Sequence, residues 1–445
     1  MASTRQIVAL SALVLLASGV ACSTGPLMRL TRPSSPHEAY VDALRGAGLD
    51  HAALGRDWVN AAARALEVPV EVTLPFRESG YFPPDKASAV AYRFSLRRGR
   101  ALTADASFET VEQGRLFVDL FRVQAGGLPE RVNSIGADAT TLTLTVDEDG
   151  EYVLRVQPEL LRGGRFNLVA RTLAELPFPV AGLSSNSVRS GFGAERDAGI
   201  RQHEGVDIFA ASGTPVVAVT SGVAQASTNN LGGNVVWLQD ARRRRTYYYA
   251  HLERTALTGT SLVEPGEVLG YVGNTGNART TAPHLHFGIY AAGGAIDPLP
   301  FIEVDQDTPA APDLVLPLGA LARVRTPRTP LQDGTAADAS VVSTLPRATL
   351  VTVLGATGRS VRVELPDDSV GYLPRQSLTA ATAALSRRPL ATGAVIRERP
   401  FAAAAVVHVV ANPVSAEVIG SFAGYDLIRA PAASGWVVGA AVSGS

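Results

Sequence analysis

The sequence is poor in cysteine and has no excess of charge of either sign. Cys22 is the single cysteine among 445 residues, so an intramolecular disulfide and a cysteine-ligated zinc finger are both excluded. The 40 basic and 41 acidic side chains leave a formal net charge of -1, which gives no overall attraction to nucleic acid or to an anionic membrane. Glycine and proline, with 42 and 28 residues, are more frequent than usual. This composition favours a loop-rich β architecture, with domains of roughly 150 residues each.

The amino-terminal segment lacks an apolar run long enough to span a membrane. Its apolar run, residues 7–17, follows a basic residue and precedes small residues that lead to Cys22. The run is too short for a bilayer core of about 30 Å, and its flanks are typical of a secretory signal peptide. The small residues before the cysteine resemble a bacterial lipobox, although Gly19 stands where that motif usually has leucine. We therefore expect a signal peptide over residues 1–21 and a lipid on Cys22; an ordinary cleaved signal peptide with an unrelated cysteine is the alternative.

The segment that follows changes its pattern twice. Residues 22–36 are rich in proline and serine without apolar periodicity, as expected for a tether. Residues 37–66 have apolar side chains three and four positions apart, which predicts one helix, or two helices broken near residues 46–48. The period then becomes two, in short segments separated by glycine and aspartate turns. We therefore expect a helix plus an antiparallel β-sandwich over residues 37–175.

Three further β-rich segments are expected. Residues 178–302 form a block that ends in an acidic, proline-rich linker. Residues 314–382 have the short alternating strands of a small barrel, and residues 388–445 repeat this pattern more weakly. Residues 371–373 (Gly-Tyr-Leu), for example, are matched by residues 435–437 (Gly-Trp-Val). The first copy resembles bacterial SH3-like domains, which commonly accompany wall hydrolases and bind wall peptides; the second is a degenerate copy.

Four of the seven histidines lie in the block from residue 178 to 302. His203 and Asp207 form an H-x-G-x-D pattern, in which the glycine and the following apolar pair predict a turn that enters a strand. Imidazole nitrogen and carboxylate oxygen commonly bind zinc together. His284 and His286 form an H-x-H pattern in a predicted strand, so both side chains are expected on one face, about 6 to 7 Å apart.

The other histidines carry weaker signals. His251 lies at the end of another alternating strand and gains weight only from its neighbours in the block. His37 and His51 lie on the predicted helices and are interpreted as surface residues. His408 lies in an apolar strand and is interpreted as a structural histidine.

Residues 242–245 are four consecutive arginines, followed by three tyrosines. We interpret this run as a charged hairpin tip between two strands. The alternative is a patch that binds anionic wall polymers or lipid head groups.

A series of short motifs runs through about 125 of the 445 residues. They are SGFG at 190–193, Arg196, HEGVDI at 203–208, GTPV at 213–216, SGV at 221–223, GGN at 232–234, YAHL at 249–252, GYVGNTG at 270–276 and HLHF at 284–287. This series resembles the lysostaphin-type (LytM-like) zinc metallopeptidases, which cut the peptide part of peptidoglycan. Two loops depart from the family pattern. Two residues separate Gly193 from Arg196 where the family usually has one, and residues 279–282 replace the Ser-Thr-Gly that usually precedes the H-x-H pattern. Because both departures lie in loops, they bear on substrate preference more than on catalysis.

The resemblance assigns roles to five residues. It implies that His203, Asp207 and His286 bind Zn2+ and that His251 and His284 are the catalytic pair. Three protein ligands leave a fourth tetrahedral position for water, as a hydrolytic zinc requires. One of the catalytic histidines is expected to accept the proton of the water, and the other to stabilise the oxyanion or protonate the leaving amine. The sequence leaves open which of the two has which role.

We therefore expect a mainly β, multidomain protein: an N-terminal β-sandwich, a central antiparallel β metallopeptidase domain and tandem C-terminal SH3-like barrels. The expected function is zinc-dependent hydrolysis of stem peptides or cross-links of bacterial peptidoglycan. One alternative is a non-catalytic regulatory lipoprotein that binds the wall or activates a partner hydrolase or divisome protein; another is a zinc peptidase that acts on proteins. We expect an exported protein of the cell envelope, attached to the membrane through the lipid on Cys22, in the outer membrane or on the periplasmic face, without a nucleic-acid partner.

Overall fold

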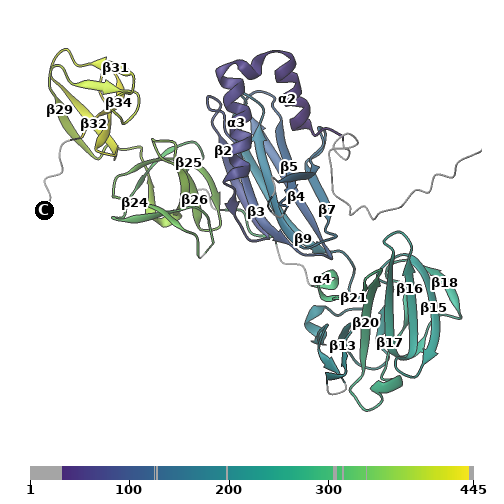
Figure 1. Cartoon of the computed structure of the whole chain (residues 1–445). Helices are drawn as coiled ribbons and strands as arrows, with labels where there is room; N and C mark the ends of the chain where they lie inside the picture. Colours follow the sequence, from purple (N-terminus) through teal and green to yellow (C-terminus); the bar gives the residue numbers. More distant parts are fainter. Residues whose placement is uncertain are drawn as a thin grey trace, which may run out of the picture. The chain divides into compact units, whose positions relative to one another are not determined.

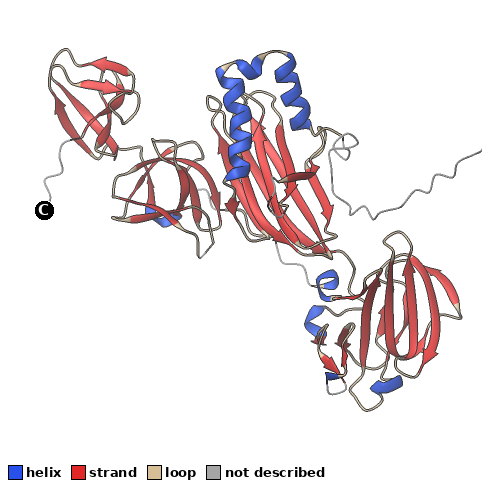
Figure 2. Cartoon of the chain, in the orientation of Figure 1, coloured by secondary structure: helices blue, strands red, loops and turns tan. Residues whose placement is uncertain are grey.

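The computed structural model describes residues 33–439, apart from residues 125, 127, 128, 197, 198, 304–307, 313, 314 and 337. The predicted signal peptide, Cys22 and most of the predicted tether lie outside the described residues. Strands dominate the described part of the chain (Figure 2), so the expectation of a mainly β protein is confirmed. Within these residues, no helix has both the length and the apolar character needed to cross a membrane.

The helical segment is broken where the sequence predicts. Helix α2 (Pro36–Gly46) begins at a capping box formed by Ser35 and Glu38, which satisfies the first free backbone N–H groups. A short 3-10 turn (Leu49–His51) separates it from α3 (Ala53–Glu67). Gly48 has a φ of 69°, a left-handed conformation that glycine adopts at little cost. The break therefore follows from the glycine after α2.

Residues 70–174 form two sheets that share one apolar core. Strand order in the first sheet is β1-β3-β8-β5-β6, and β2, β9, β4 and β7 are neighbours in the second. Most pairings are antiparallel, but β1 pairs with β3 in parallel, which the expected antiparallel arrangement did not include. The strands are β1 (Val70–Glu71), β2 (Phe76–Phe82), β3 (Val90–Leu96), β4 (Arg100–Thr110), β5 (Leu116–Arg122), β6 (Glu130–Ser134), β7 (Thr141–Thr145), β8 (Gly150–Pro158) and β9 (Gly164–Ala174).

Strand β5 shows how the helices are held. Val118 and Leu120 point into the core between the two sheets. Because side chains alternate along a strand, Phe117 and Phe121 point to the opposite face, where they pack against residues of α2 and α3. Both helices lie alongside this sheet (Figure 1). The sheet is therefore covered on both faces.

His37 is not the surface residue that the sequence suggests. It is 5% exposed, its ring stacks on Trp58 at 4.9 Å between centroids, and its Nε2 donates a hydrogen bond to Gln157 Oε1 at 2.8 Å. The cause is the helix face: Leu44, two turns further along α2, points into the same cluster. By contrast, His51 is exposed, as expected, and His408 is half-buried in a strand.

Strand β2 also pairs with β25, so the second sheet continues into a later part of the chain. Near this junction, Arg362 Nε donates to Glu78 Oε1 at 2.8 Å, and both side chains are buried. Tyr372 Oη donates to the other oxygen of Glu78 at 3.4 Å. A fully buried ion pair therefore joins residues 284 positions apart in the sequence.

Residues 321–438 form two small β units with separate cores. Tyr372 pairs with a residue of β23, and Trp436 pairs with the corresponding strand of the second unit, β30. The strands of the first unit are β22 (Leu321–Val324), β23 (Thr329–Gln332), β24 (Val341–Leu345), β25 (Leu350–Thr357), β26 (Ser360–Glu364), β27 (Val370–Pro374) and β28 (Leu378–Ala380). Those of the second are β29 (Ser386–Leu390), β30 (Val395–Arg397), β31 (Val406–Val409), β32 (Val414–Phe422), β33 (Tyr425–Arg429) and β34 (Ser434–Val438).

Residues 188–302 contain a ten-stranded sheet whose main order is β10-β13-β20-β17-β16-β15-β18. Its strands pair antiparallel. Its main apolar core includes Val206 and Phe287, and Val235, Tyr248 and Ala250 form a smaller second cluster. The elements are β10 (Val188–Ser190), β13 (Val206–Phe209), β14 (Pro215–Val217), β15 (Gly222–Asn229), β16 (Gly233–Asp240), β17 (Arg245–Thr255), β18 (Thr260–Val263), β19 (Val268–Val272), β20 (His284–Ala291), β21 (Gly294–Ile296) and the short helix α4 (Leu299–Ile302); β11 (Glu195–Arg196) and β12 (Arg201–Gln202) form a separate hairpin.

Three residues of the arginine run, 242–244, lie in the turn between β16 and β17, and Arg245 begins β17, as the hairpin interpretation expects. Arg243 Nη1 donates to Asp240 Oδ2 at 2.8 Å, and Arg245 Nη1 donates to Glu175 Oε1 at 2.8 Å. Arg245 is buried. Two of the four arginines are thus engaged in ion pairs of the fold.

Candidate metal centre

Three neighbouring strands position the candidate residues. In the register of β13 and β20, Asp207 lies opposite His286. In the register of β20 and β17, His286 lies opposite Ala250. His203 comes from the turn just before β13, as the H-x-G-x-D pattern predicts. The sheet therefore brings together residues that are 83 positions apart in the sequence.

His203, Asp207 and His286 direct one ligand atom each at a common point. His203 Nε2 lies 3.0 Å from Asp207 Oδ1 and 2.9 Å from His286 Nδ1. His286 Nδ1 lies 3.1 Å from the same carboxylate oxygen. Among the described residues, these three form the group of His, Cys, Asp and Glu side chains whose ligand atoms converge closely enough to hold a metal ion. Two imidazole nitrogens and one carboxylate oxygen are a donor set that suits zinc.

A hairpin before β13 sets the orientation of the His203 ring. Its Nδ1 lies 2.8 Å from the carbonyl oxygen of Gly191. That nitrogen donates the hydrogen bond, which leaves Nε2 as the unprotonated nitrogen that faces Asp207 and His286. The hairpin backbone is closed by two hydrogen bonds, from Gly193 N to His203 O and from His203 N to Ala194 O, both 2.8 Å. The ring is therefore held in the tautomer that a metal ligand needs.

Arg196 holds the second oxygen of the aspartate. Its Nη2 donates to Asp207 Oδ2 at 2.8 Å and to Ser190 Oγ at 2.6 Å. The two carboxylate oxygens therefore have different partners: Oδ2 faces the arginine and Oδ1 faces the two histidines. Arg196 belongs to the motif series of the sequence, but no role could be given to it there, because its contact with Asp207 depends on the fold of the hairpin.

Gly205 explains the glycine of the H-x-G-x-D pattern. A Cβ at this position would lie 2.5 Å from the carbonyl oxygen of Phe287 and 2.9 Å from His286 Nε2. Both distances are shorter than any ordinary carbon contact. The backbone of residue 205 approaches the ligand strand so closely that only glycine fits.

His251 and His284 lie beside the three candidate ligands. The centroids of their rings are 5.0 Å apart, and the ring of His251 lies 6.0 Å from that of His286. Both are buried, with 8% and 6% exposure. His251 Nδ1 lies 2.9 Å from Thr275 O, and His284 Nδ1 lies 2.9 Å from Ala282 O. In each ring Nδ1 therefore carries the proton, and Nε2 is free to accept one.

A backbone irregularity aims His251 at the centre. The register between β16 and β17 shifts where Val236 pairs with Tyr249 but Asn234 pairs with Leu252. The extra residue in β17 is a β-bulge, a device that redirects a side chain. His251 itself has a φ of 63°, and its backbone N–H donates to Gly232 O at 2.7 Å. Simple alternation along the strand would turn His251 to the core face of Tyr249, so the sequence pattern alone does not give its direction.

Electrostatics favour an ionised aspartate and a neutral His251. Burial raises the pKa of Asp207, but the adjacent imidazoles of His203 and His286 outweigh this effect and hold the pKa well below its usual range. Burial lowers the pKa of His251 to about 4, and the nearby His284 acts in the same direction. At neutral pH the site therefore presents a carboxylate and an unprotonated imidazole Nε2. The structure brings all five residues singled out in the sequence into one cluster.

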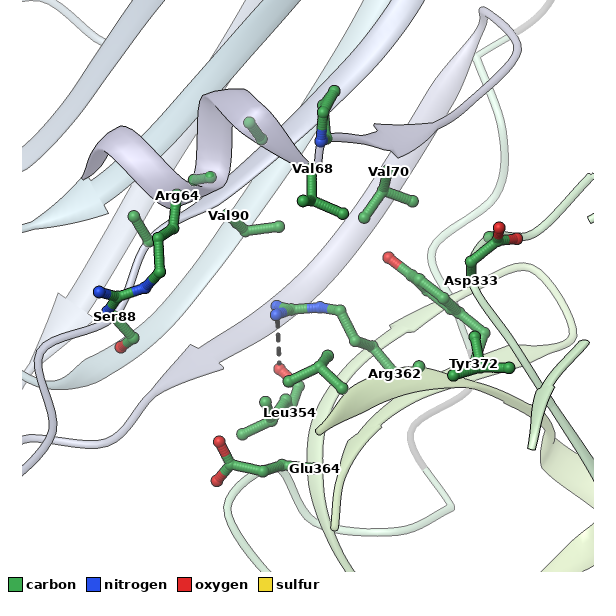
Figure 3. Close-up of a pocket in the computed structure, with 18 of the residues that line it drawn as sticks. Arg64, Val68, Val70, Ser88, Val90, Asp333, Leu354, Arg362, Glu364 and Tyr372 are labelled. Carbon is green, nitrogen blue, oxygen red and sulfur yellow. Dashed lines mark hydrogen bonds between the residues drawn. The ribbon is translucent and has the colours of Figure 1, made fainter. Parts of the chain in front are cut away.

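A large cavity of the chain lies away from this cluster. It has a volume of about 1020 Å³ and is lined by residues of α3, β3 and the first small β unit, including Arg64, Val90 and Tyr372 (Figure 3). No histidine lines it. Arg362, one of the lining residues, donates a hydrogen bond to Leu354 O. None of the five clustered residues thus lines this cavity.

Comparison with known proteins identifies the class of this segment. Residues 201–298 match the model of Peptidase family M23. The chain therefore contains a peptidase M23 domain, which includes all five clustered residues. The match runs from β12 to β21 and includes every strand of the ten-stranded sheet except β10.

Individual relatives match a minor part of the chain. The L-Ala--D-Glu endopeptidase of Bacillus subtilis is 38% identical over 144 residues, which are 29% of this chain and 44% of that protein. The peptidoglycan DD-endopeptidase ShyC of Vibrio cholerae is 38% identical over 91 residues, 20% of each chain. The solved catalytic domain of lysostaphin from Staphylococcus simulans is 34% identical; the match covers 26% of this chain and 92% of that domain, with a TM-score of 0.24. The chain thus spans less than half the length of the two curated relatives.

Proposed function

We propose that this protein is a zinc-dependent endopeptidase that hydrolyses stem peptides or peptide cross-links of bacterial peptidoglycan. The convergence of His203, Asp207 and His286, with His251 and His284 beside them, is the observation that carries the proposal. The match to Peptidase family M23 and the endopeptidase names of the relatives support it.

The metal ligands are His203 Nε2, Asp207 Oδ1 and His286 Nδ1. Their fit to zinc rests on the donor set and on the tautomer of His203, which places a lone pair toward the other two ligand atoms. A bound zinc ion supplies Lewis acidity toward a peptide carbonyl and lowers the pKa of a hydrolytic water. Arg196 orients the aspartate, so that one oxygen is directed at the ligand position.

His251 and His284 handle protons through their Nε2 atoms. Both Nδ1 atoms donate to backbone carbonyls, so each Nε2 begins as an acceptor. One of them accepts the proton of the attacking water, as a general base does. Once protonated, that Nε2 can donate to the developing oxyanion or to the leaving amine. The close pairing of the two rings supports a shared role in these steps.

A catalytic role is favoured over a purely regulatory one by the completeness of the cluster. A regulator that only binds the wall or a partner hydrolase needs no unprotonated Nε2 beside a metal position. Here both His251 and His284 are buried, and each is oriented by a hydrogen bond from its Nδ1. Because burial of a polar imidazole costs free energy, this placement favours a functional role for both rings.

The other segments are proposed to place the enzyme in the cell envelope. The apolar run and Cys22 support export and lipid attachment, in the outer membrane or on the periplasmic face. Residues 314–382 and 388–445 are proposed to be SH3-like barrels that bind the wall, and residues 37–175 an accessory sandwich. The near-neutral charge supports a partner other than nucleic acid.

Digestion of purified peptidoglycan sacculi tests this proposal. The chain from Ser23 onward is incubated with sacculi as purified, after chelation, and after zinc is restored, and released fragments are identified by mass. We expect zinc-dependent release of peptide-cleaved fragments and loss of release in His286→Ala. Wall-lytic activity that survives chelation or His286→Ala would overturn the assignment.

A further inference from the structure

Three aromatic side chains continue the face of the sheet that carries the metal ligands. On β20, His284, His286, Gly288 and Tyr290 project from one face because side chains alternate along a strand. Gly288 lies opposite Tyr248 of β17, and Tyr248 lies opposite Trp237 of β16. We call Trp237, Tyr248 and Tyr290 the aromatic shelf.

The rings of the aromatic shelf touch each other and reach the metal centre. The centroid of Trp237 is 4.1 Å from that of Tyr248 and 5.8 Å from that of Tyr290. The ring of Tyr248 lies edge-on to His286 at 5.9 Å. Tyr248 is buried and braced by Asn229, whereas Trp237 and Tyr290 are half-buried. Tyr248 thus connects the partly exposed ring of Trp237 with a candidate zinc ligand.

The absence of a side chain at Gly288 leaves space for the Tyr290 ring. A Cβ at this position would lie 3.1 Å from the Tyr290 ring and 3.1 Å from the carbonyl oxygen of Glu204. The Tyr290 ring therefore folds back along its own strand, over the space that a side chain at position 288 would fill. Its Oη donates to Glu204 Oε2 at 3.2 Å.

Glu204 adds a negative charge at the edge of the shelf. It follows His203 directly in the chain, and it is exposed. In the part of the chain that the structure describes, Tyr290 is its hydrogen-bond partner and no basic side chain pairs with it. An exposed carboxylate held next to electron-rich ring faces is the environment that attracts an organic cation, because each ring presents a negative quadrupole to the charge.

We propose that the aromatic shelf and Glu204 bind a primary ammonium group on the peptide substrate, the side chain of a lysine or of a diamino acid close to the scissile bond. This inference rests on the proposed peptidase function and names the class of residue that the site selects. An extended peptide advances about 3.3 Å per residue, so the shelf is reached within about two residues of a bond held at the metal centre. The alkyl part of such a side chain lies on the rings while its charge meets the carboxylate.

The test compares sacculi with free and with acetylated amino groups. Acetylation removes the charge and keeps the peptide bonds. We expect acetylation to slow fragment release by the zinc-loaded full chain roughly tenfold. Glu204→Gln and Trp237→Leu should each slow release from untreated sacculi roughly fivefold and leave the rate on acetylated sacculi unchanged. Glu264→Gln, an exposed carboxylate in the connection between β18 and β19, is the matched control and should behave as the parent on both.

A binding measurement separates failure of this inference from failure of the proposed function. Nα-acetyl-lysine methylamide and its Nε-acetylated form are titrated into the zinc-loaded chain. The readout is the change in tryptophan fluorescence that is absent in Trp237→Leu, since the chain has three tryptophans. Preferential binding of the charged probe, lost in Glu204→Gln, supports the shelf even if sacculi are not cut. Equal rates on the two kinds of sacculi, or equal binding of the two probes, would overturn the inference while leaving zinc-dependent hydrolysis intact.

Discussion

Arg196 Nη2 lies 2.8 Å from Asp207 Oδ2, on the side of the carboxylate away from His203 and His286. This contact determines which oxygen remains for a metal. It also comes from a hairpin that carries a candidate ligand, His203, at its other end. The hairpin therefore supplies one ligand and orients another.

Removing the guanidinium should weaken zinc binding. Arg196→Met leaves Asp207 free to rotate, and loss of such outer contacts typically costs about 10- to 100-fold in metal affinity. Competition with a chromophoric chelator measures the affinity directly. Arg189→Met, an exposed arginine on the neighbouring strand β10, is the control. An affinity equal to that of the parent in Arg196→Met would show that the aspartate needs no such support.

Gly205→Ala should disturb the same centre through sterics alone. The new Cβ would collide with the Phe287 carbonyl and the His286 ring, and overpacking of this kind costs about 1 to 3 kcal/mol. We expect lower thermal stability together with weaker zinc binding. Gly191→Ala is the matched control, because a Cβ there meets no atom within 4 Å. Normal zinc affinity in Gly205→Ala would contradict the close approach of the two strands.

His37 should make stability depend on pH. Burial, with a contribution from Arg155, lowers the pKa of His37 to about 4, below the unfolded value of 6.5. Between pH 6.5 and 4, His37 therefore binds a proton in the unfolded chain but not in the folded chain. The free energy of unfolding is therefore unaffected by protonation of His37 above pH 6.5. It decreases as pH falls from 6.5 toward 4, by about 3 kcal/mol at most.

Thermal unfolding at several pH values, followed by the fluorescence of Trp58 and the other tryptophans, checks this window. His37→Gln keeps a hydrogen-bonding group but cannot be protonated, so its stability should fall less between pH 6.5 and 4. Identical pH dependence of the parent and the variant would count against a buried, neutral His37.

The buried ion pair of Glu78 and Arg362 should be essential for stability. Arg362→Met leaves the Glu78 carboxylate buried without its cation, which costs about 3 to 5 kcal/mol. Replacing both residues, as Glu78→Leu with Arg362→Met, should recover much of that loss because no lone charge remains. Denaturant unfolding measures both. A single variant as stable as the parent would mean that the pair is solvated.

Local patterns in the sequence predicted much of this structure. The helix break near Gly48 and the strand with His284 and His286 follow from local residue choice and periodicity. The grouping of the five residues was implied by the resemblance to lysostaphin-type metallopeptidases, and the structure brings these residues together. His37 was misplaced because helix periodicity marks a face and says little about which polar residues on that face are buried.

Long-range relationships were not predictable in the same way. The pairing of β2 with β25 and the Glu78–Arg362 contact join segments that no local pattern connects. The direction of His251 depends on a bulge in β17 that disrupts strand alternation. The aromatic shelf required the register of three strands, although its residues stand in plain alternating segments.

The most direct test of the catalytic account is the behaviour of His284→Ala. This residue is not a ligand in the account, so the variant should bind zinc with the affinity of the parent and unfold at a similar temperature. Zinc content, unfolding temperature and fragment release from sacculi are measured on the same preparation. The account predicts a folded, zinc-loaded protein that releases fragments at least about 100-fold more slowly. Release at the parental rate would contradict it.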